Sequence, residues 1–138
     1  MSEIKTNKLT GTSTAGSILV TGEGNSTTTS LQQGLCKTWV NFTGISSTAA
    51  RDSFNVSSLT DDGTGRTTIA FSNNMANANY SGSWYNNGES GVNYNNFSND
   101  FIGGFMPRVT GSYSVYAYAT NGGADAYYND STIVGDLA

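Results

Sequence analysis

The sequence has no histidine, a single cysteine and a single proline, and only 12% of its 138 residues are charged. Without histidine, the chain lacks the side chain that most often exchanges protons near neutral pH. Cys36 has no second cysteine for an internal disulfide and no histidine to activate it, so we expect a small, half-buried hydrophobic residue. These absences lead us to expect no enzyme activity, no bound metal and no cofactor.

Basic residues are also scarce. The chain carries six Lys and Arg against ten Asp and Glu, a net charge of −4, and the six form no cluster. A nucleic-acid-binding protein needs a basic stripe to neutralise phosphates, so we expect no nucleic-acid partner. No apolar run is long enough to span a bilayer, and the first residues lack the apolar stretch of a secretory signal. We therefore expect a protein that is made in the cytoplasm and not exported by the usual secretory route, with no membrane insertion.

Half of the chain consists of four small or polar residue types: 18 Ser, 18 Thr, 16 Asn and 17 Gly. Aromatic residues make up a further 12%. Disordered chains usually combine high net charge with few aromatic residues, which is the opposite of this composition. Ser, Asn and Gly disfavour helices and suit turns between short strands. The composition predicts a folded, all-β protein.

Residues 1–35 differ from the rest of the chain. They hold one short apolar run, Ile18-Leu19-Val20, between Gly- and Thr-rich stretches. Such a segment has no hydrophobic face large enough to fold alone, so it is either disordered or ordered by pairing with copies of itself or with a partner surface. We expect an extended N-terminal arm.

From Cys36 onward the sequence alternates with the period of β-strands. Residues 37–42 place Thr38, Val40 and Phe42 on one side, and residues 51–59 are expected to place Phe54 and Val56 on one face. The Asp-Gly dipeptide at 62–63 separates two β-rich runs, which predicts a hairpin at about residues 52–72 with Ile69 and Phe71 facing together. Met75 and Tyr80 follow as expected core residues.

The C-terminal part continues the pattern. Tyr113, Val115 and Ala117 alternate with polar or aromatic residues, residues 121–131 are expected to be a turn-rich connection, and residues 132–138 a short strand. Residues 36–138 are therefore predicted to form a small antiparallel β-sandwich of six or seven strands.

Acidic residues are the remaining candidates for catalysis. Asp61 and Asp62 fit a hairpin tip, where Asp is common, and lack the later glutamate of an EF-hand loop. Asp100, Asp125 and Asp130 lie in separate segments, and a two-carboxylate glycosidase pair or a structural calcium between them stays an open alternative.

Aromatic and amide side chains are concentrated in residues 81–100, which we expect to form an ordered, exposed loop, and again near residue 128. Aromatic rings stack on the apolar faces of sugars, and Tyr, Ser, Gly and Asn dominate antibody recognition loops. Packing in the core or at an interface is the alternative for each ring. The candidate ligand-binding residues are Trp84, Tyr85, Asn86, Asn87, Tyr94, Asn95, Tyr127 and Tyr128.

Four stretches give the chain a family resemblance: GLCKTWVNF at 34–42, RDSFNVSSLTDDGTG at 51–65, MANANY at 75–80 and GDLA at 135–138. They resemble the distal domain of tail-fibre-like proteins of marine bacteriophages. The opening MSEIKTNKL is similar to the virion-attachment arm of such proteins. The chain departs from the pattern at Ala76, where the family usually has proline, across residues 84–100, and in having no long shaft.

The resemblance implies a homotrimer located on the virion, on the tail or the head. Its arm would attach to a tail or capsid protein, and its sandwich would bind a host-surface glycan or protein. The candidate attachment and trimer residues are Ile4, Leu9, Ile18, Leu19 and Val20. The alternatives are a decoration protein that grips neighbouring virion subunits, and a fibre domain with hydrolase activity.

Overall fold

The computed structural model describes residues 3–11, 18–87, 108–119 and 122–138. The chain divides into two compact units, Met1–Leu35 and Cys36–Ala138. The division falls where the alternating strand pattern of the sequence begins. Among the described residues, no helix is long and apolar enough to cross a membrane.

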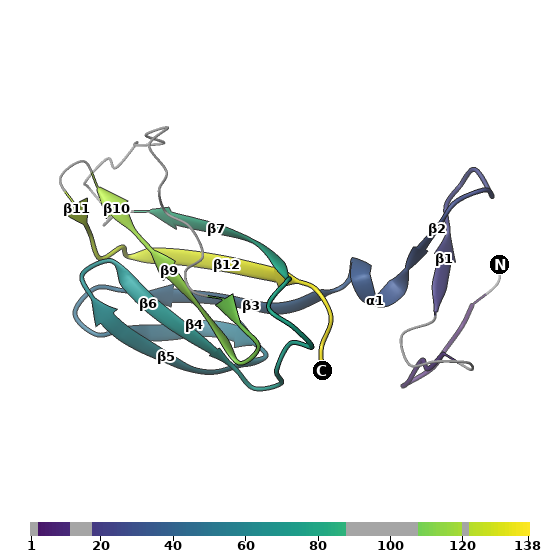
Figure 1. Cartoon of the computed structure of the whole chain (residues 1–138), viewed down its shortest axis with the longest axis horizontal. Coiled ribbons are helices and arrows are strands. Elements are labelled where there is room, and N and C mark those ends of the chain that lie inside the picture. Colours follow the sequence, from purple (N-terminus) through teal and green to yellow (C-terminus); the bar gives the residue numbers. More distant parts are fainter. Residues whose placement is uncertain (1–2, 12–17, 88–107, 120–121) are drawn as a thin grey trace. The chain divides into compact units, whose positions relative to one another are not determined.

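The first unit contains a small hairpin and a helical turn. β1 (Leu19–Thr21) pairs antiparallel with β2 (Thr28–Ser30), and α1 (Leu31–Gly34) follows directly (Figure 1). Within the connection, Asn25 adopts a left-handed φ of 55° and its N–H donates to the carbonyl of Gly22. Within the predicted N-terminal arm, the Gly- and Asn-rich residues 22–26 thus form a turn between two short strands.

The second unit is an antiparallel β-sandwich, which confirms the predicted fold class. One four-stranded sheet has the order β4-β3-β12-β7 and the other β5-β6-β9-β8 (Figure 1). Within the described residues the two sheets together contain eight strands, against the expected six or seven, and β10 and β11 form a separate short ribbon. The strands are β3 (Cys36–Thr43), β4 (Ala49–Phe54), β5 (Val56–Gly63), β6 (Arg66–Phe71), β7 (Ser81–Asn87), β8 (Arg108–Val109), β9 (Ser112–Tyr116), β10 (Tyr118–Ala119), β11 (Gly122–Gly123) and β12 (Tyr128–Val134).

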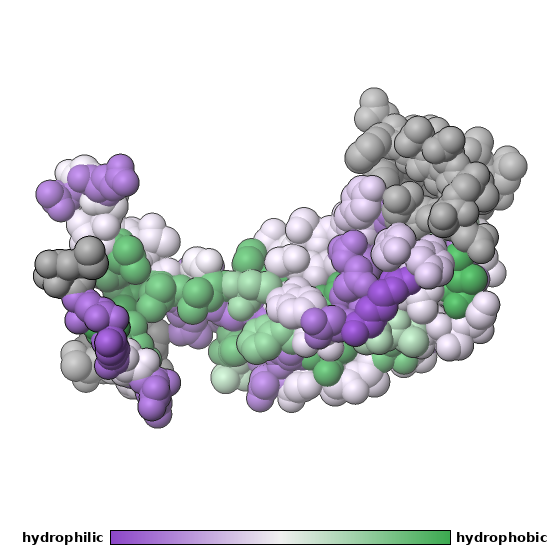
Figure 2. All heavy atoms as spheres, turned by 180° about the vertical axis from the view of Figure 1, so that it is seen from behind, coloured by the Kyte–Doolittle hydropathy of each residue, from purple (hydrophilic) through white to green (hydrophobic). Residues whose placement is uncertain are grey.

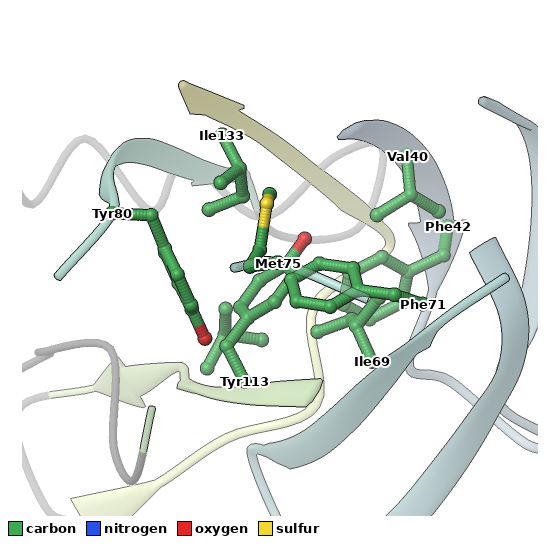
Figure 3. Close-up of a cluster of buried hydrophobic side chains, with 9 residues drawn as sticks. Val40, Phe42, Ile69, Phe71, Met75, Tyr80, Tyr113 and Ile133 are labelled. Carbon is green, nitrogen blue, oxygen red and sulfur yellow. The ribbon is translucent and has the colours of Figure 1, made fainter. Parts of the chain in front are cut away.

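The core lies between the two sheets and is rich in aromatic side chains (Figure 3). The ring of Phe71 lies 5.5 Å from the ring of Tyr113 and 5.7 Å from that of Tyr80, centroid to centroid. Such tilted and edge-on contacts add to the stabilisation from area burial alone. The buried cluster is Val40, Phe42, Ile69, Phe71, Met75, Tyr80, Tyr113, Val115 and Ile133. The predicted inward positions on β3, β6 and β9 and the two predicted core residues of 72–80 are thereby confirmed.

Asn55 carries the chain from one sheet to the other. It has a φ of 60°, in the left-handed region where Asn is tolerated better than most residues. Its side chain donates to the carbonyls of Lys37 and Asn73 and accepts from the Asn73 N–H at 2.7 Å. Because of this turn, Phe54 ends β4 with an exposed ring, whereas Val56 begins β5 and packs against the core. The expectation that these two residues share one face was wrong.

β5 and β6 form the predicted hairpin, with Leu59 opposite Ile69. The tight connection is Thr64-Gly65, so the Asp-Gly dipeptide belongs to the end of β5. Gly65 has a φ of 74°, and a Cβ placed on it would clash with the carbonyl oxygen of Ala117. Its N–H donates to Asp125 Oδ1 at 2.8 Å. Through Gly65, the Gly-Thr-Gly of the motif therefore holds the hairpin tip against residues 117–125.

Candidate functional site

The side chains of Trp84 and Tyr85 point to opposite faces of β7. Trp84 packs against the buried cluster, and Tyr85 is 48% exposed. Both residues lie in a strand and not in the loop that their composition suggested, because β7 extends to Asn87. In the register of β7 with β12, Asn86 lies on the same side as Trp84. The backbone of Asn87 ends the strand.

Tyr128 also lies in a strand. β12 begins at this residue, so the expected turn-rich connection ends earlier than predicted. The sequence pattern did not predict that Asn129 and Ser131 belong to this strand and bury their polar side chains on its inner face. The Tyr127 ring contacts the Tyr128 ring edge-on, with 4.8 Å between centroids.

The outer face of the β4-β3-β12-β7 sheet brings these tyrosines together with residues that sequence reasoning did not select. Strand pairing sets Trp39 between Phe54 and Thr132, and it sets Asn41 between Asp52 and Asp130. Tyr85 lies opposite Asp130 on the other side of β12. We call this surface the aromatic face; its residues are Trp39, Asn41, Arg51, Asp52, Phe54, Tyr85, Tyr127, Tyr128 and Asp130.

Five aromatic rings of this face are accessible to solvent. Their exposed fractions are 37% for Trp39, 52% for Phe54, 48% for Tyr85, 38% for Tyr127 and 43% for Tyr128. Exposed rings on adjacent strands, with polar groups between them, are typical of binding surfaces, where Tyr and Trp offer both apolar area and a hydrogen-bonding group. The surface view in Figure 2 shows the C-terminal unit with hydrophilic and intermediate residues beside separate apolar areas.

Hydrogen bonds order the polar groups of the aromatic face. Asn41 Nδ2 donates to Asp130 Oδ1 at 2.5 Å, between the neighbouring strands β3 and β12; the two residues are 89 positions apart in the sequence. Arg51 Nη1 lies 3.4 Å from Asn41 Oδ1, and Arg51 Nη2 donates to the carbonyl of Tyr127 at 2.6 Å. These contacts fix which side of the Asn41 amide carries the oxygen and which carries the nitrogen.

Arg51 is held by two rings as well as by hydrogen bonds. Its Cζ lies 4.7 Å from the ring centroid of Tyr127 and 4.6 Å from that of Tyr128. Both distances are within the range of cation–π attraction. Arg51 stands on the edge strand β4 and reaches across β3 to the start of β12, so it fixes the two tyrosines on this surface.

The second sheet presents a different outer face. Thr60, Thr68 and Ser114 lie side by side in register, and the Thr68 and Ser114 hydroxyl oxygens are 2.7 Å apart. Thr68 also donates to Asp62 Oδ2. Small hydroxyl side chains that bond one another offer little contact area, so the aromatic face is the stronger candidate for recognition.

The acidic residues considered for catalysis or calcium have structural partners. Asp61 Oδ1 accepts the N–H of Gly63, and Asp125 Oδ1 accepts that of Gly65. Within the described ranges no three His, Cys, Asp or Glu residues group as a metal site. Asp100 lies outside the described residues. Cys36 is exposed and not half-buried as expected, because it begins β3 at the end of the sheet.

The other predicted site residues lie at exposed positions, at one partly buried position or outside the described residues. Tyr94 and Asn95 lie outside the described residues, as does the side chain of Asn87. Ile4, Leu9, Leu19 and Val20 are exposed, whereas Ile18 is partly buried, and its carbonyl accepts the N–H of Leu31. The first unit thus presents apolar side chains to solvent, visible at its surface in Figure 2.

Comparisons with known proteins identify no relative. No protein-family model matches the chain, and no significant match was found among curated proteins or among solved structures.

Proposed function

We propose that this chain is a structural protein of a bacteriophage virion, a short tail or head fibre whose sandwich binds glycans of the host surface through the aromatic face. The N-terminal unit attaches the protein to the virion and associates with copies of itself. The resemblance of the 34–42, 51–65 and 135–138 motifs to tail-fibre-like proteins supports the virion assignment.

The observation that carries the binding role is the set of exposed rings around the Asn41–Asp130 pair. Sugar rings have apolar faces that stack on aromatic side chains, and hydroxyl groups that hydrogen-bond to amides and carboxylates. The aromatic face provides both kinds of contact on one sheet. Its polar groups are already ordered by Arg51, so binding loses less conformational entropy.

The first unit supports association with other chains. A two-stranded hairpin is only marginally stable alone, and Leu19 and Val20 of β1 are 60% and 50% exposed. Packing against further copies in a homotrimer, or against a tail or capsid protein, would bury these side chains and stabilise the hairpin. Three-fold display would then multiply weak glycan contacts on a host surface.

A decoration protein that grips neighbouring virion subunits is the second candidate. The observation that favours it is the pairing of Trp39 with Phe54, two exposed apolar rings opposite each other on adjacent strands. Such a pair also suits a hydrophobic contact with protein.

Binding to bacterial cells separates the two candidates. We would add the labelled full chain to a panel of marine bacteria and to emptied phage capsids, beside a variant with Tyr85→Ala and Tyr128→Ala. The matched control is Val109→Ala, which shortens an exposed apolar side chain on the other sheet. The proposal predicts cell binding that only the double variant loses. Saturable capsid binding without cell binding would favour decoration, and release of reducing sugar would contradict a purely binding role.

A further inference from the structure

The centre of the aromatic face is polar, whereas its surroundings are aromatic. We propose that the Asn41–Asp130 pair binds the hydroxyl groups of a sugar ring and selects uncharged glycans over acidic ones. This inference rests on the proposed function and adds the substrate class and the residues that choose it.

Strand register gives this centre its shape. Trp39 precedes Asn41 by two residues on β3, Tyr128 precedes Asp130 by two residues on β12, and Tyr85 is opposite Asp130 on β7. Same-face neighbours along a strand are about 7 Å apart, and neighbouring strands about 4.8 Å. Because β3 and β12 are antiparallel, Trp39 and Tyr128 lie on opposite sides of the pair. Aromatic rings therefore lie on three sides of the pair, at distances comparable to the width of a sugar ring.

The hydrogen bonds of the pair leave groups for a ligand. Asn41 uses one amide hydrogen for Asp130 Oδ1, and that bond engages only one of the two carboxylate oxygens. An amide NH₂ has a second hydrogen, and a carboxylate accepts several bonds. Neighbouring hydroxyls of one sugar can thus donate to the carboxylate and accept from the amide. Hydrogen bonds to an ionised group are stronger than neutral ones, so Asp130 is the dominant contact.

Charge at this centre disfavours acidic sugars. Asp52 and Asp130 stand on either side of Asn41 in the same row. The nearby cation is Arg51, whose guanidinium is already engaged by Asn41 Oδ1, by the Tyr127 carbonyl and by two rings. Lys37 is buried and lies four residues along β3 from Asn41, about 13 Å away. If an acidic sugar stacked its ring on Tyr85, its carboxylate would approach the carboxylate of Asp130 and be repelled.

The test uses the full chain on a printed panel of bacterial polysaccharides, half of them uncharged and half containing uronic or sialic acid. The informative variant is Asp130→Asn, whose side-chain oxygen can still accept from Asn41 but carries no charge. The matched control is Asp62→Asn, which removes a carboxylate from the other sheet and can still accept from Thr68. We expect binding to uncharged polysaccharides, weakened at least about tenfold by Asp130→Asn and unchanged by Asp62→Asn.

Three results would overturn the inference. These are a preference for acidic polysaccharides, equal binding by the Asp130→Asn variant, and binding to bacterial cells without binding to any printed polysaccharide. In each of them, cell binding that is lost with Tyr85→Ala and Tyr128→Ala would leave the proposed function standing. A chain that binds neither cells nor polysaccharides would remove the proposed function and this inference together.

Discussion

Trp84 and Tyr85 are adjacent in β7, and the sheet separates their side chains: the indole of Trp84 packs on the core, and the phenol of Tyr85 faces solvent beside Asp130. Two residues that look equivalent in the sequence therefore have different physical roles. One stabilises the sandwich, and the other is available to a ligand.

Alanine substitution should distinguish the two. We expect Trp84→Ala to lower the free energy of unfolding by about 2–4 kcal/mol, because it removes a partly buried indole from the core. Tyr85→Ala should change it by less than about 0.5 kcal/mol. Urea unfolding followed by circular dichroism measures both. Equal losses of stability would show that Tyr85 also packs, and would weaken the case for the aromatic face.

The hydroxyls of Tyr113 and Ser131 lie 2.5 Å apart and join the two sheets through the core. We expect Tyr113→Phe and Ser131→Ala each to cost about 1–3 kcal/mol, because each leaves the other hydroxyl buried without this partner. The double variant should cost less than the sum, with a coupling energy above about 0.5 kcal/mol. A double-mutant cycle based on urea unfolding measures this coupling energy. Strictly additive losses of stability would show that the hydrogen bond does not contribute to it.

Stability should also fall at high pH. Burial raises the pKa of Tyr113 from 10.0 to about 12, although the Ser131 hydrogen bond acts in the other direction. A raised pKa means that the folded state holds the proton more tightly than the unfolded state. The contribution of protonated Tyr113 to the free energy of unfolding is therefore complete below pH 10. It is lost as the pH rises toward 12, by about 3 kcal/mol in all.

Urea unfolding at intervals from pH 9 to 12 follows this loss. Tyr113→Phe should flatten the pH dependence in that range, apart from a smaller contribution of the same sign from Tyr80, whose pKa burial also raises. An unchanged slope in the Tyr113→Phe variant would assign the alkaline loss to other groups.

Asn55 should be one of the least replaceable residues outside the core. Asn55→Gly keeps access to the left-handed φ but loses the side-chain bonds to Lys37 and Asn73, at an expected cost of about 1–3 kcal/mol. Asn55→Ala loses the bonds and adds about 1 kcal/mol of backbone strain. Thermal unfolding should rank wild type above Gly and Gly above Ala. The reverse order of Gly and Ala would contradict the strain argument.

Periodicity predicted most of the sandwich because its core strands alternate strictly. Val40, Phe42, Ile69 and Phe71 are inward in the sequence pattern and in the structure. The pattern failed at Asn55, where alternation continues through a residue that changes sheets. It failed again in β12, whose inner face buries the polar Asn129 and Ser131 together with Ile133. The Asn129 amide donates to the Ala126 carbonyl, a contact that composition does not reveal.

The candidate site was only partly predictable for a similar reason. Tyr85 and Tyr128 stand out by residue type, and both lie on the aromatic face. Asn41 and Asp130 become partners only through the register of β3 with β12, which pairs residues 89 positions apart. In the sequence, Arg51 is recognisable only as part of the 51–65 motif. Its contacts with the two tyrosines across β3 are seen only in the structure.

The most direct test of the account uses the two tryptophans as internal reporters. Trp39 lies on the aromatic face, and Trp84 packs on the core. Polysaccharide from a bacterium that the protein binds would be titrated into the labelled full chain while the indole N–H resonances are followed by NMR. The account predicts that the Trp39 resonance shifts or broadens with ligand and that the Trp84 resonance stays in place. Saturable binding that leaves the Trp39 resonance unperturbed would contradict it.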